Sequence, residues 1–153
     1  MAAEFEPLLA RHDEFLETLL LHQEALVRGD LESAADLIGE LADELAAHIR
    51  HEEECLLPVL ESRGGWCRFG EPRFYREDHE RILALVAELA GATRELDRGG
   101  ARRERAVALL IGREQAFRSL LEHHDDRERR GLFPDLARVT SPQEREALVA
   151  AAG

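Results

Sequence analysis

Lysine is absent from this sequence, because all 20 basic residues among its 153 are arginine. A lysine nucleophile or a lysine Schiff base is therefore excluded. Cysteine is also scarce, and Cys55 and Cys67 do not make a disulfide framework in a chain of this length. No apolar run approaches the roughly 18 residues of a membrane span, and the first residues lack the basic start and apolar stretch of a signal peptide. We therefore expect a cytoplasmic protein without membrane association.

Positive charge is the minority charge in this chain. Acidic residues number 32 against 20 basic ones, which gives a formal net charge of −12. Because an acidic surface repels phosphate backbones, we expect no nucleic-acid partner, and a partner should instead be basic, neutral or small. Apolar residues make up 44% of the chain, which is enough for one hydrophobic core. We expect a single domain over residues 1–153.

The composition favours helix throughout. Aromatic residues are only 5% of the chain, alternating apolar patterns are absent, and Ala, Leu, Glu and Arg dominate. Glycine and proline divide the chain, and Gly131 with Pro134 is expected to end the last long helix. The predicted helices cover residues 4–28, 31–63, 72–98 and 101–130, with a short helix over 142–151. This pattern predicts an all-α, antiparallel up-down-up-down four-helix bundle over about residues 4–131, followed by a short C-terminal helix.

Each predicted long helix carries one histidine on its apolar stripe. These histidines are His12, His48, His79 and His124. An internal repeat adds two carboxylates, because residues 48–60 align without gaps on residues 124–136 and share His, Glu, Leu, Pro and Leu at the same places. The repeat pairs His48 with Glu52 and His124 with Glu128.

The spacing within each pair has a chemical meaning. A histidine and a glutamate four residues apart project from one helix face, so both can bind one cation or share two. One such pair alone is ordinarily a solvated helix pair, and one such histidine alone is ordinarily a core residue. Two buried glutamates without partners would be costly, however, and cations would remove that cost. Four imidazoles and two carboxylates suit two iron ions, with manganese or zinc as weaker choices. The ferritin-like arrangement is not expected, since no histidine here has a glutamate three residues before it.

These segments resemble the hemerythrin-like HHE cation-binding domains over about residues 4–138. The resemblance implies a four-helix bundle around a non-heme di-iron centre with an oxo or hydroxo bridge. It also implies His12, His48, His79 and His124 as terminal ligands and Glu52 and Glu128 as bridges. The implied function is the binding or reduction of dioxygen, peroxide or nitric oxide, with or without catalytic turnover. An iron-dependent sensor or adaptor with a protein partner is the alternative, and a purely structural bundle with satisfied core histidines is a third.

The sequence departs from the oxygen-carrying hemerythrins at two positions. Tyr75 stands where those proteins have a further histidine, and Arg129 stands where they have their closing carboxylate. Both departures favour the wider HHE group over a reversible oxygen carrier. Tyr75 is a candidate catalytic residue, because four residues before His79 its phenol would point toward the irons; packing over the bundle end is the equal alternative.

The remaining polar residues are expected to be peripheral. His22, His51 and His123 are predicted to lie at the surface or beside the ligands rather than to bind the metal themselves. Glu53 and Asp125 are predicted to be solvated.

Overall fold

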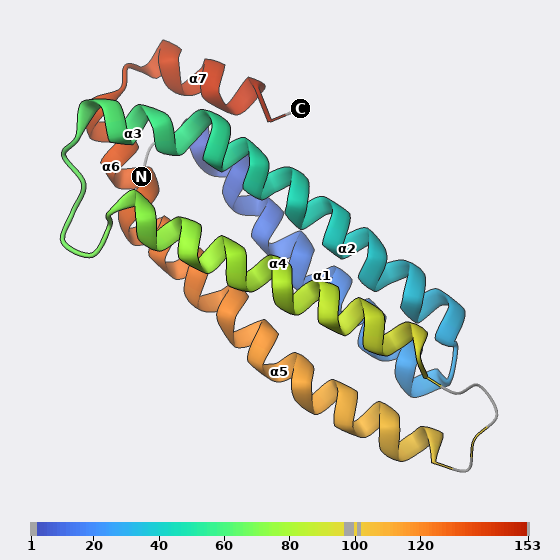
Figure 1. Ribbon diagram of the computed structural model, residues 1–153. Helices are drawn as coiled ribbons and strands as arrows, with labels where there is room; N and C mark the ends of the chain where they lie inside the picture. The colour runs from blue at the N-terminus through green and yellow to red at the C-terminus, as the bar shows by residue number, and fades with distance from the viewer. Residues whose placement is uncertain (1–2, 97–99, 101, 153) are drawn as a thin grey trace.

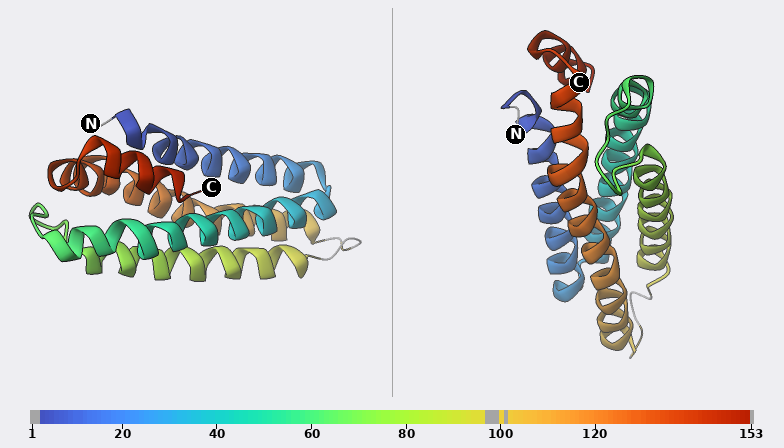
Figure 2. Two further views of the ribbon diagram at one scale, coloured as in Figure 1. Left: turned by 90° about the horizontal axis from the view of Figure 1, so that it is seen from above. Right: turned by 90° about the vertical axis from the view of Figure 1, so that its left-hand side faces the viewer.

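The chain forms a bundle of four long helices, seen side on in Figure 1 and from two further directions in Figure 2. This computed structural model describes residues 3–96, 100 and 102–152. The long helices are α1 (Glu6–Arg28), α2 (Leu31–His51), α4 (Pro72–Arg94) and α5 (Arg103–Arg127). Successive long helices run in opposite directions, and the four-sided arrangement places α1 beside α2 and α5, and α4 beside α2 and α5. The prediction of an all-α helical bundle is confirmed.

The turn between α1 and α2 shows how tightly the helices are joined. Gly29 adopts a left-handed conformation with φ of 76°, which costs glycine no steric strain, and its N–H bonds back to α1. The carboxylate of Asp30 then accepts a hydrogen bond from the backbone N–H of Ser33 and caps α2. A short 3₁₀ turn, η1 (Ala3–Phe5), precedes α1 at the other end.

Two wide turns interrupt the helical path. The sequence predicted continuous α-helix at the first turn and the end of a helix at the second. The π-helical turn η2 (Glu52–Leu56) separates α2 from α3 (Leu57–Arg63), within the predicted helix 31–63. A second π turn, η3 (Glu128–Leu132), connects α5 to α6 (Phe133–Val139). The predicted helix end at Gly131 is therefore wrong, because the helical path continues through the glycine to Val139.

The repeated prolines explain why both turns widen at the same place. In each turn a backbone N–H bonds to the carbonyl five residues earlier, from Leu57 to Glu52 and from Phe133 to Glu128. Pro58 and Pro134 follow directly and have no N–H to donate. In a regular α-helix each ring would also meet the carbonyl four residues earlier, so the wide turn accommodates the proline without ending the helix.

The C-terminal segment folds back over the bundle as α7 (Pro142–Ala150), close to the predicted 142–151. It begins with a capping box, in which Ser141 and Glu144 bond reciprocally. The predicted helix 72–98 is shorter in the structure, since α4 ends at Arg94, and its last predicted residues lie partly outside the described part of the chain.

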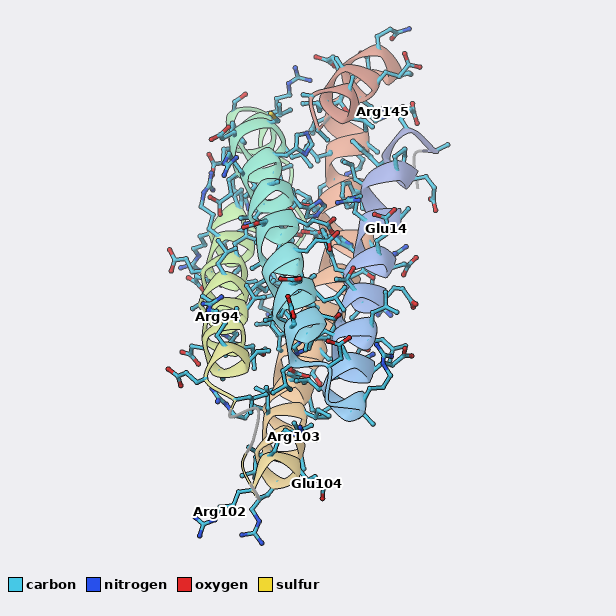
Figure 3. The ribbon with its side chains drawn as sticks, turned by 90° about the vertical axis from the view of Figure 1, so that its right-hand side faces the viewer. Glu14, Arg94, Arg102, Arg103, Glu104 and Arg145 are labelled. Atoms are coloured by element: carbon cyan, nitrogen blue, oxygen red, sulfur yellow. The ribbon has the colours of Figure 1, made fainter. Side chains whose placement is uncertain are left out.

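Two separate hydrophobic clusters fill the bundle. The long core lies between the four long helices and includes Phe15, Leu19, Ile38, Leu41, Leu45, Ile82, Val86, Leu110 and Phe117. The end core lies beneath the wide turns and consists of Phe5, Leu8, Leu9, Leu56, Leu57, Leu60, Tyr75, Leu132, Phe133 and Leu136. Charged side chains such as Glu14 and Arg94 point outward from the bundle (Figure 3). No helix in the described ranges is long and apolar enough to cross a membrane.

Candidate metal centre

Six buried side chains meet in a polar layer between the long core and the end core. Each long helix contributes one histidine: His12 from α1, His48 from α2, His79 from α4 and His124 from α5. Glu52 and Glu128 join them from the first residues of η2 and η3. The structure thus brings together all six residues that the sequence singled out as candidate ligands. They form two overlapping groups, in each of which the candidate ligand atoms lie within 4.8 Å of one another.

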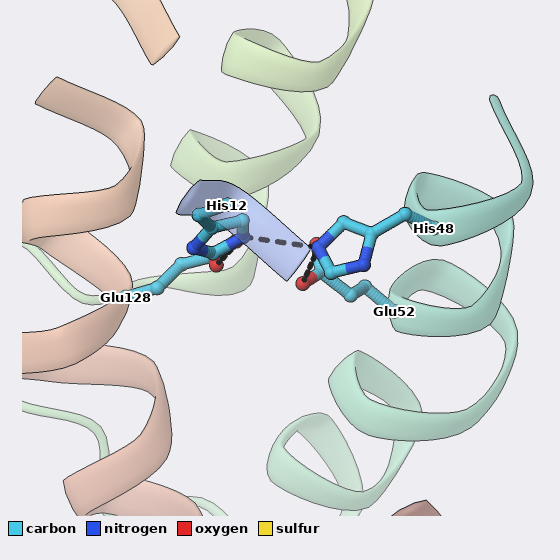
Figure 4. A group of neighbouring side chains, drawn as sticks. All are labelled: His12, His48, Glu52 and Glu128. Carbon is cyan, nitrogen blue, oxygen red and sulfur yellow. Dashed lines mark hydrogen bonds and ion pairs between the residues drawn. The ribbon is translucent and has the colours of Figure 1, made fainter. Parts of the chain in front are cut away.

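The first group consists of His12, His48 and both glutamates, and Figure 4 shows their side chains converging. The Nε2 atoms of His12 and His48 are 3.0 Å apart. His48 Nε2 lies 2.9 Å from Glu52 Oε1, and His12 Nε2 lies 3.1 Å from Glu128 Oε2. Two ring nitrogens and two carboxylate oxygens therefore surround one small volume.

The second group consists of His79, His124 and the same two glutamates. His79 Nε2 lies 3.1 Å from Glu52 Oε2, and His124 Nε2 lies 2.7 Å from Glu128 Oε1. Each carboxylate thus has one oxygen on either pair of histidines. This is the arrangement that two adjacent cations bridged by two carboxylates require.

The donor atoms lack partners of their own, which is the test of whether a metal fits here. Both oxygens of Glu52 and of Glu128, and the Nε2 atoms of His79 and His124, are buried without a hydrogen bond of good geometry. Both glutamate side chains are 0% exposed. An uncompensated buried carboxylate is strongly unfavourable, and a bound cation satisfies both oxygens at once. Nitrogen and oxygen donors without thiolate suit iron, manganese or zinc.

The charges of the layer favour a cation as well. Burial and the neighbouring Glu128 raise the pKa of Glu52, but the imidazoles of His48 and His79 more than offset this and hold it below its usual value. Burial likewise raises the pKa of Glu128, and His124 and His12 outweigh it, so that the pKa lies well below its usual value. Both carboxylates are therefore ionised at neutral pH, which is the form in which they bind a metal.

Comparison with protein families matches residues 4–136 to the hemerythrin HHE cation-binding domain. The chain belongs to this family. Comparisons with curated proteins and with solved structures gave no match. The family assignment and the two buried groups agree that the HHE domain binds cations.

Three carboxylates around the HHE centre lie beside the Nδ1 atoms of three histidines. These are the outer ring nitrogens, which face away from the candidate metal site. Asp125 hydrogen-bonds to Nδ1 of His12, and Glu53 Oε1 lies 2.9 Å from Nδ1 of His79. The expectation that Asp125 and Glu53 are merely solvated is wrong. Each is adjacent in sequence to a candidate ligand, but the histidine it contacts belongs to a different helix, which the local pattern could not reveal.

Asp78 takes the equivalent place beside His124. Its Oδ2 atom lies 3.6 Å from His124 Nδ1, beyond hydrogen-bond distance, and also accepts from Arg127. Arg129 plays the corresponding part for Asp125, donating to its two oxygens at 2.8 and 2.9 Å. The guanidinium groups hold these carboxylates in place.

Tyr75 lies in the end core of the HHE domain, with 1% of its surface exposed. Its hydroxyl faces Gly131, where a β-carbon would come within 2.6 Å of the phenol oxygen. Burial raises the pKa of the phenol, and the nearby Cys67 and Glu128 add to the rise. The hydroxyl is therefore protonated at neutral pH.

The other histidines of the HHE domain have separate roles. His22 is fully buried, which contradicts the expected peripheral position. It bonds to Glu114 at 2.6 Å and to the Ala34 carbonyl at 2.8 Å. His51 bonds to the Leu148 carbonyl of α7 at 2.8 Å, and His123 is exposed as expected. The helical spacing of His22 after Leu19 and before Leu26 could have placed it in the core.

Proposed function

We propose that this HHE domain holds two iron ions between its two histidine pairs and binds or reduces a small oxidant. The observation that carries the proposal is that both groups of candidate ligands share the same two carboxylates, with one oxygen of each on either pair. His12 and His48 would be the terminal ligands of one iron, His79 and His124 those of the other. Glu52 and Glu128 would bridge them.

The donor count leaves room for an oxidant. Each group offers two imidazole nitrogens and two carboxylate oxygens, which is fewer than the about six positions of octahedral iron. A small cavity of about 20 Å³, roughly the space of one water molecule, borders the centre beside His12, His48 and His124. Its other walls include Phe15, Leu45, Ile82 and Leu121.

Apolar walls and small size suit a diatomic molecule or peroxide rather than a larger substrate. Bound iron supplies Lewis acidity and electrons. The side chains fix the geometry and keep bulk water away.

Tyr75 stays in the proposal as a group that serves the oxidant from the side of the end core, since it does not line the cavity beside His12, His48 and His124. Its phenol stays protonated at neutral pH and can donate a hydrogen bond. Tyr75→Phe is therefore expected to change the visible spectrum of the iron-loaded protein and its reactivity with peroxide. If both stay unchanged, Tyr75 is a packing residue of the end core.

The iron content of the purified protein tests the proposal most directly. Protein produced under iron-replete conditions should carry about two irons per chain, and anaerobic reduction followed by dioxygen, peroxide or nitric oxide should change its visible bands. His124→Ala should lower the iron content, whereas His123→Ala, a substitution of the exposed neighbouring histidine, should not. Equal iron content in both variants, or a spectrum indifferent to every oxidant, would contradict the proposal.

A sensor or adaptor with the same iron centre is the second candidate, and one contact favours it. His51 lies between the candidate ligands His48 and Glu52 and hydrogen-bonds to the Leu148 carbonyl of α7. Helix α7 follows the residues that match the family, so the centre is linked to an added segment. This candidate predicts that iron removal loosens α7 and abolishes capture of a partner, while the isolated protein turns over no oxidant.

A further inference from the structure

The Nδ1 atoms of the four histidines, which are the ring nitrogens that face away from the centre, differ in their carboxylate partners. These partners follow the order of the helices around the bundle. His12 on α1 is held by Asp125 on α5, and His124 on α5 faces Asp78 on α4. His79 on α4 is held by Glu53 in η2, the turn that continues α2. Each of these carboxylates is next in sequence to a candidate ligand of its own helix. The carboxylates therefore form a ring around the bundle in which each faces the histidine of a neighbouring helix, with a hydrogen bond at His12 and at His79 and a longer ion-pair contact of 3.6 Å at His124.

The ring is interrupted between α2 and α1. The outer nitrogen Nδ1 of His48 has neither a hydrogen bond nor an ion pair with a carboxylate within the described residues, whereas His124 Nδ1 at least faces Asp78. Position 11, which is next to His12, carries an arginine instead of a carboxylate. Arg11 and His48 line the same surface groove of about 360 Å³, together with Glu44, His51 and Val149. Within this groove the guanidinium of Arg11 approaches Glu44 at 3.7 Å.

His48 is also the residue that the groove and the inner cavity have in common. Its imidazole separates the apolar cavity beside the centre from the surface between α1, α2 and α7. Histidine ligands without an outer hydrogen-bond partner are less well oriented, and loss of such a partner typically weakens metal binding by about 10–100-fold.

We propose that the cation held by His12 and His48 is the exchangeable one, and that Asp125, Asp78 and Glu53 are positioning residues that retain the other three imidazoles. This inference rests on the proposed function, because it requires two cations. It assigns the entry and loss of the metal to the groove beside Arg11. The second cation, between His79 and His124, exchanges slowly because each of its histidines has a carboxylate at its Nδ1 side, Glu53 at His79 and Asp78 at His124.

Metal release from the intact protein tests the inference. The protein is loaded anaerobically with ferrous iron and mixed with excess of a colorimetric ferrous chelator. We expect two phases of equal amplitude, one iron each, with rates that differ at least about 10-fold. His48→Ala should remove the fast phase, and His79→Ala the slow one.

Two pairs of variants test the role of the outer carboxylates. Arg11→Glu places a carboxylate at the interruption and should slow the fast phase several-fold, whereas Arg50→Glu, the same charge change at an exposed position of α2, should leave it unchanged. Glu53→Ala should accelerate the slow phase about 10-fold, whereas Glu54→Ala at the exposed neighbouring position should not. Because the Glu53 pair does not depend on Arg11, it decides the matter even if Arg11→Glu misfolds.

The outcomes separate this inference from the proposed function. Fewer than two irons per chain would contradict the proposed function itself. Two irons that leave in one phase, or carboxylate variants that behave like their controls, would overturn the exchange inference and leave the di-iron proposal standing.

Discussion

The hydroxyl of Tyr75 occupies the space that a side chain at Gly131 would need. A β-carbon at that position would lie 2.6 Å from the phenol oxygen and 3.6 Å from the sulfur of Cys67. The Tyr75 ring is buried in the end core and has little freedom to withdraw. Glycine is thus required inside η3 by the close approach of α4, whereas the sequence pattern suggested a helix end.

Gly131→Ala is therefore expected to destabilise the protein by about 1–3 kcal/mol through overpacking. This outweighs the roughly 1 kcal/mol that alanine gains over glycine in a helix. Urea unfolding of the metal-free protein measures the difference. Gly112→Ala in α5 is the matched control, because no atom lies within 4 Å of the added carbon, and it should stabilise slightly.

Tyr75→Phe should relieve the penalty of Gly131→Ala, since it removes the oxygen that the new methyl group meets. The double variant should recover a large part of the lost free energy of unfolding. A penalty of equal size in both backgrounds would show that the backbone of η3, rather than the phenol, requires glycine.

Cation binding is expected to release protons. Burial lowers the pKa of His12 and His124, but Glu128 and the outer carboxylates outweigh it and raise each pKa to about 10. Both imidazoles therefore carry a proton at about pH 8 in the metal-free protein, and a ligating nitrogen must lose it. Iron affinity should rise with pH up to about 10, and calorimetry in buffers of different ionisation enthalpy should show the release.

The same shifts predict how pH affects the metal-free fold. A raised histidine pKa stabilises the folded state fully below 6.5, and this contribution is lost as the pH rises through about 10. Iron-loaded protein should lack this loss, because the metal replaces the protons. Proton-independent iron binding at pH 8 would contradict both expectations.

The buried pair of His22 and Glu114 is expected to support the far part of the bundle. Both side chains are 0% exposed, and Gln23 donates to the second oxygen of Glu114 at 3.0 Å. Removing one partner leaves the other buried without compensation, so Glu114→Ala should cost about 3–5 kcal/mol of unfolding free energy.

Replacement of both His22 and Glu114 by leucine should restore much of the loss, as measured by urea unfolding. Iron content should stay the same in every folded variant, because the pair lies about three helical turns from His12 along α1. An iron content that falls with the pair would show that the two polar sites are coupled.

Local spacing predicted the helices and the convergence of the six candidate ligands, because both follow from a periodic apolar face. It did not predict η2 and η3, although Pro58 and Pro134 at matching places in the repeat carried the signal. Glu114 lies on the buried face of α5, but its partner His22 is far away in sequence. The contacts of Asp125 and Glu53 also join different helices, so only the packed bundle could reveal them.

The wide turns let one continuous chain segment pack into both hydrophobic clusters, on either side of the candidate metal centre. The extra residue in η2 rotates everything after it by about 100° relative to an unbroken α-helix. Leu45 in α2 can therefore face the long core while Leu57 and Leu60 in α3 face the end core. Deleting a single residue such as Glu54 would turn α3 away from that second cluster, so the packing of α3 beside the candidate metal centre depends on the number of residues in the turn as much as on their kind.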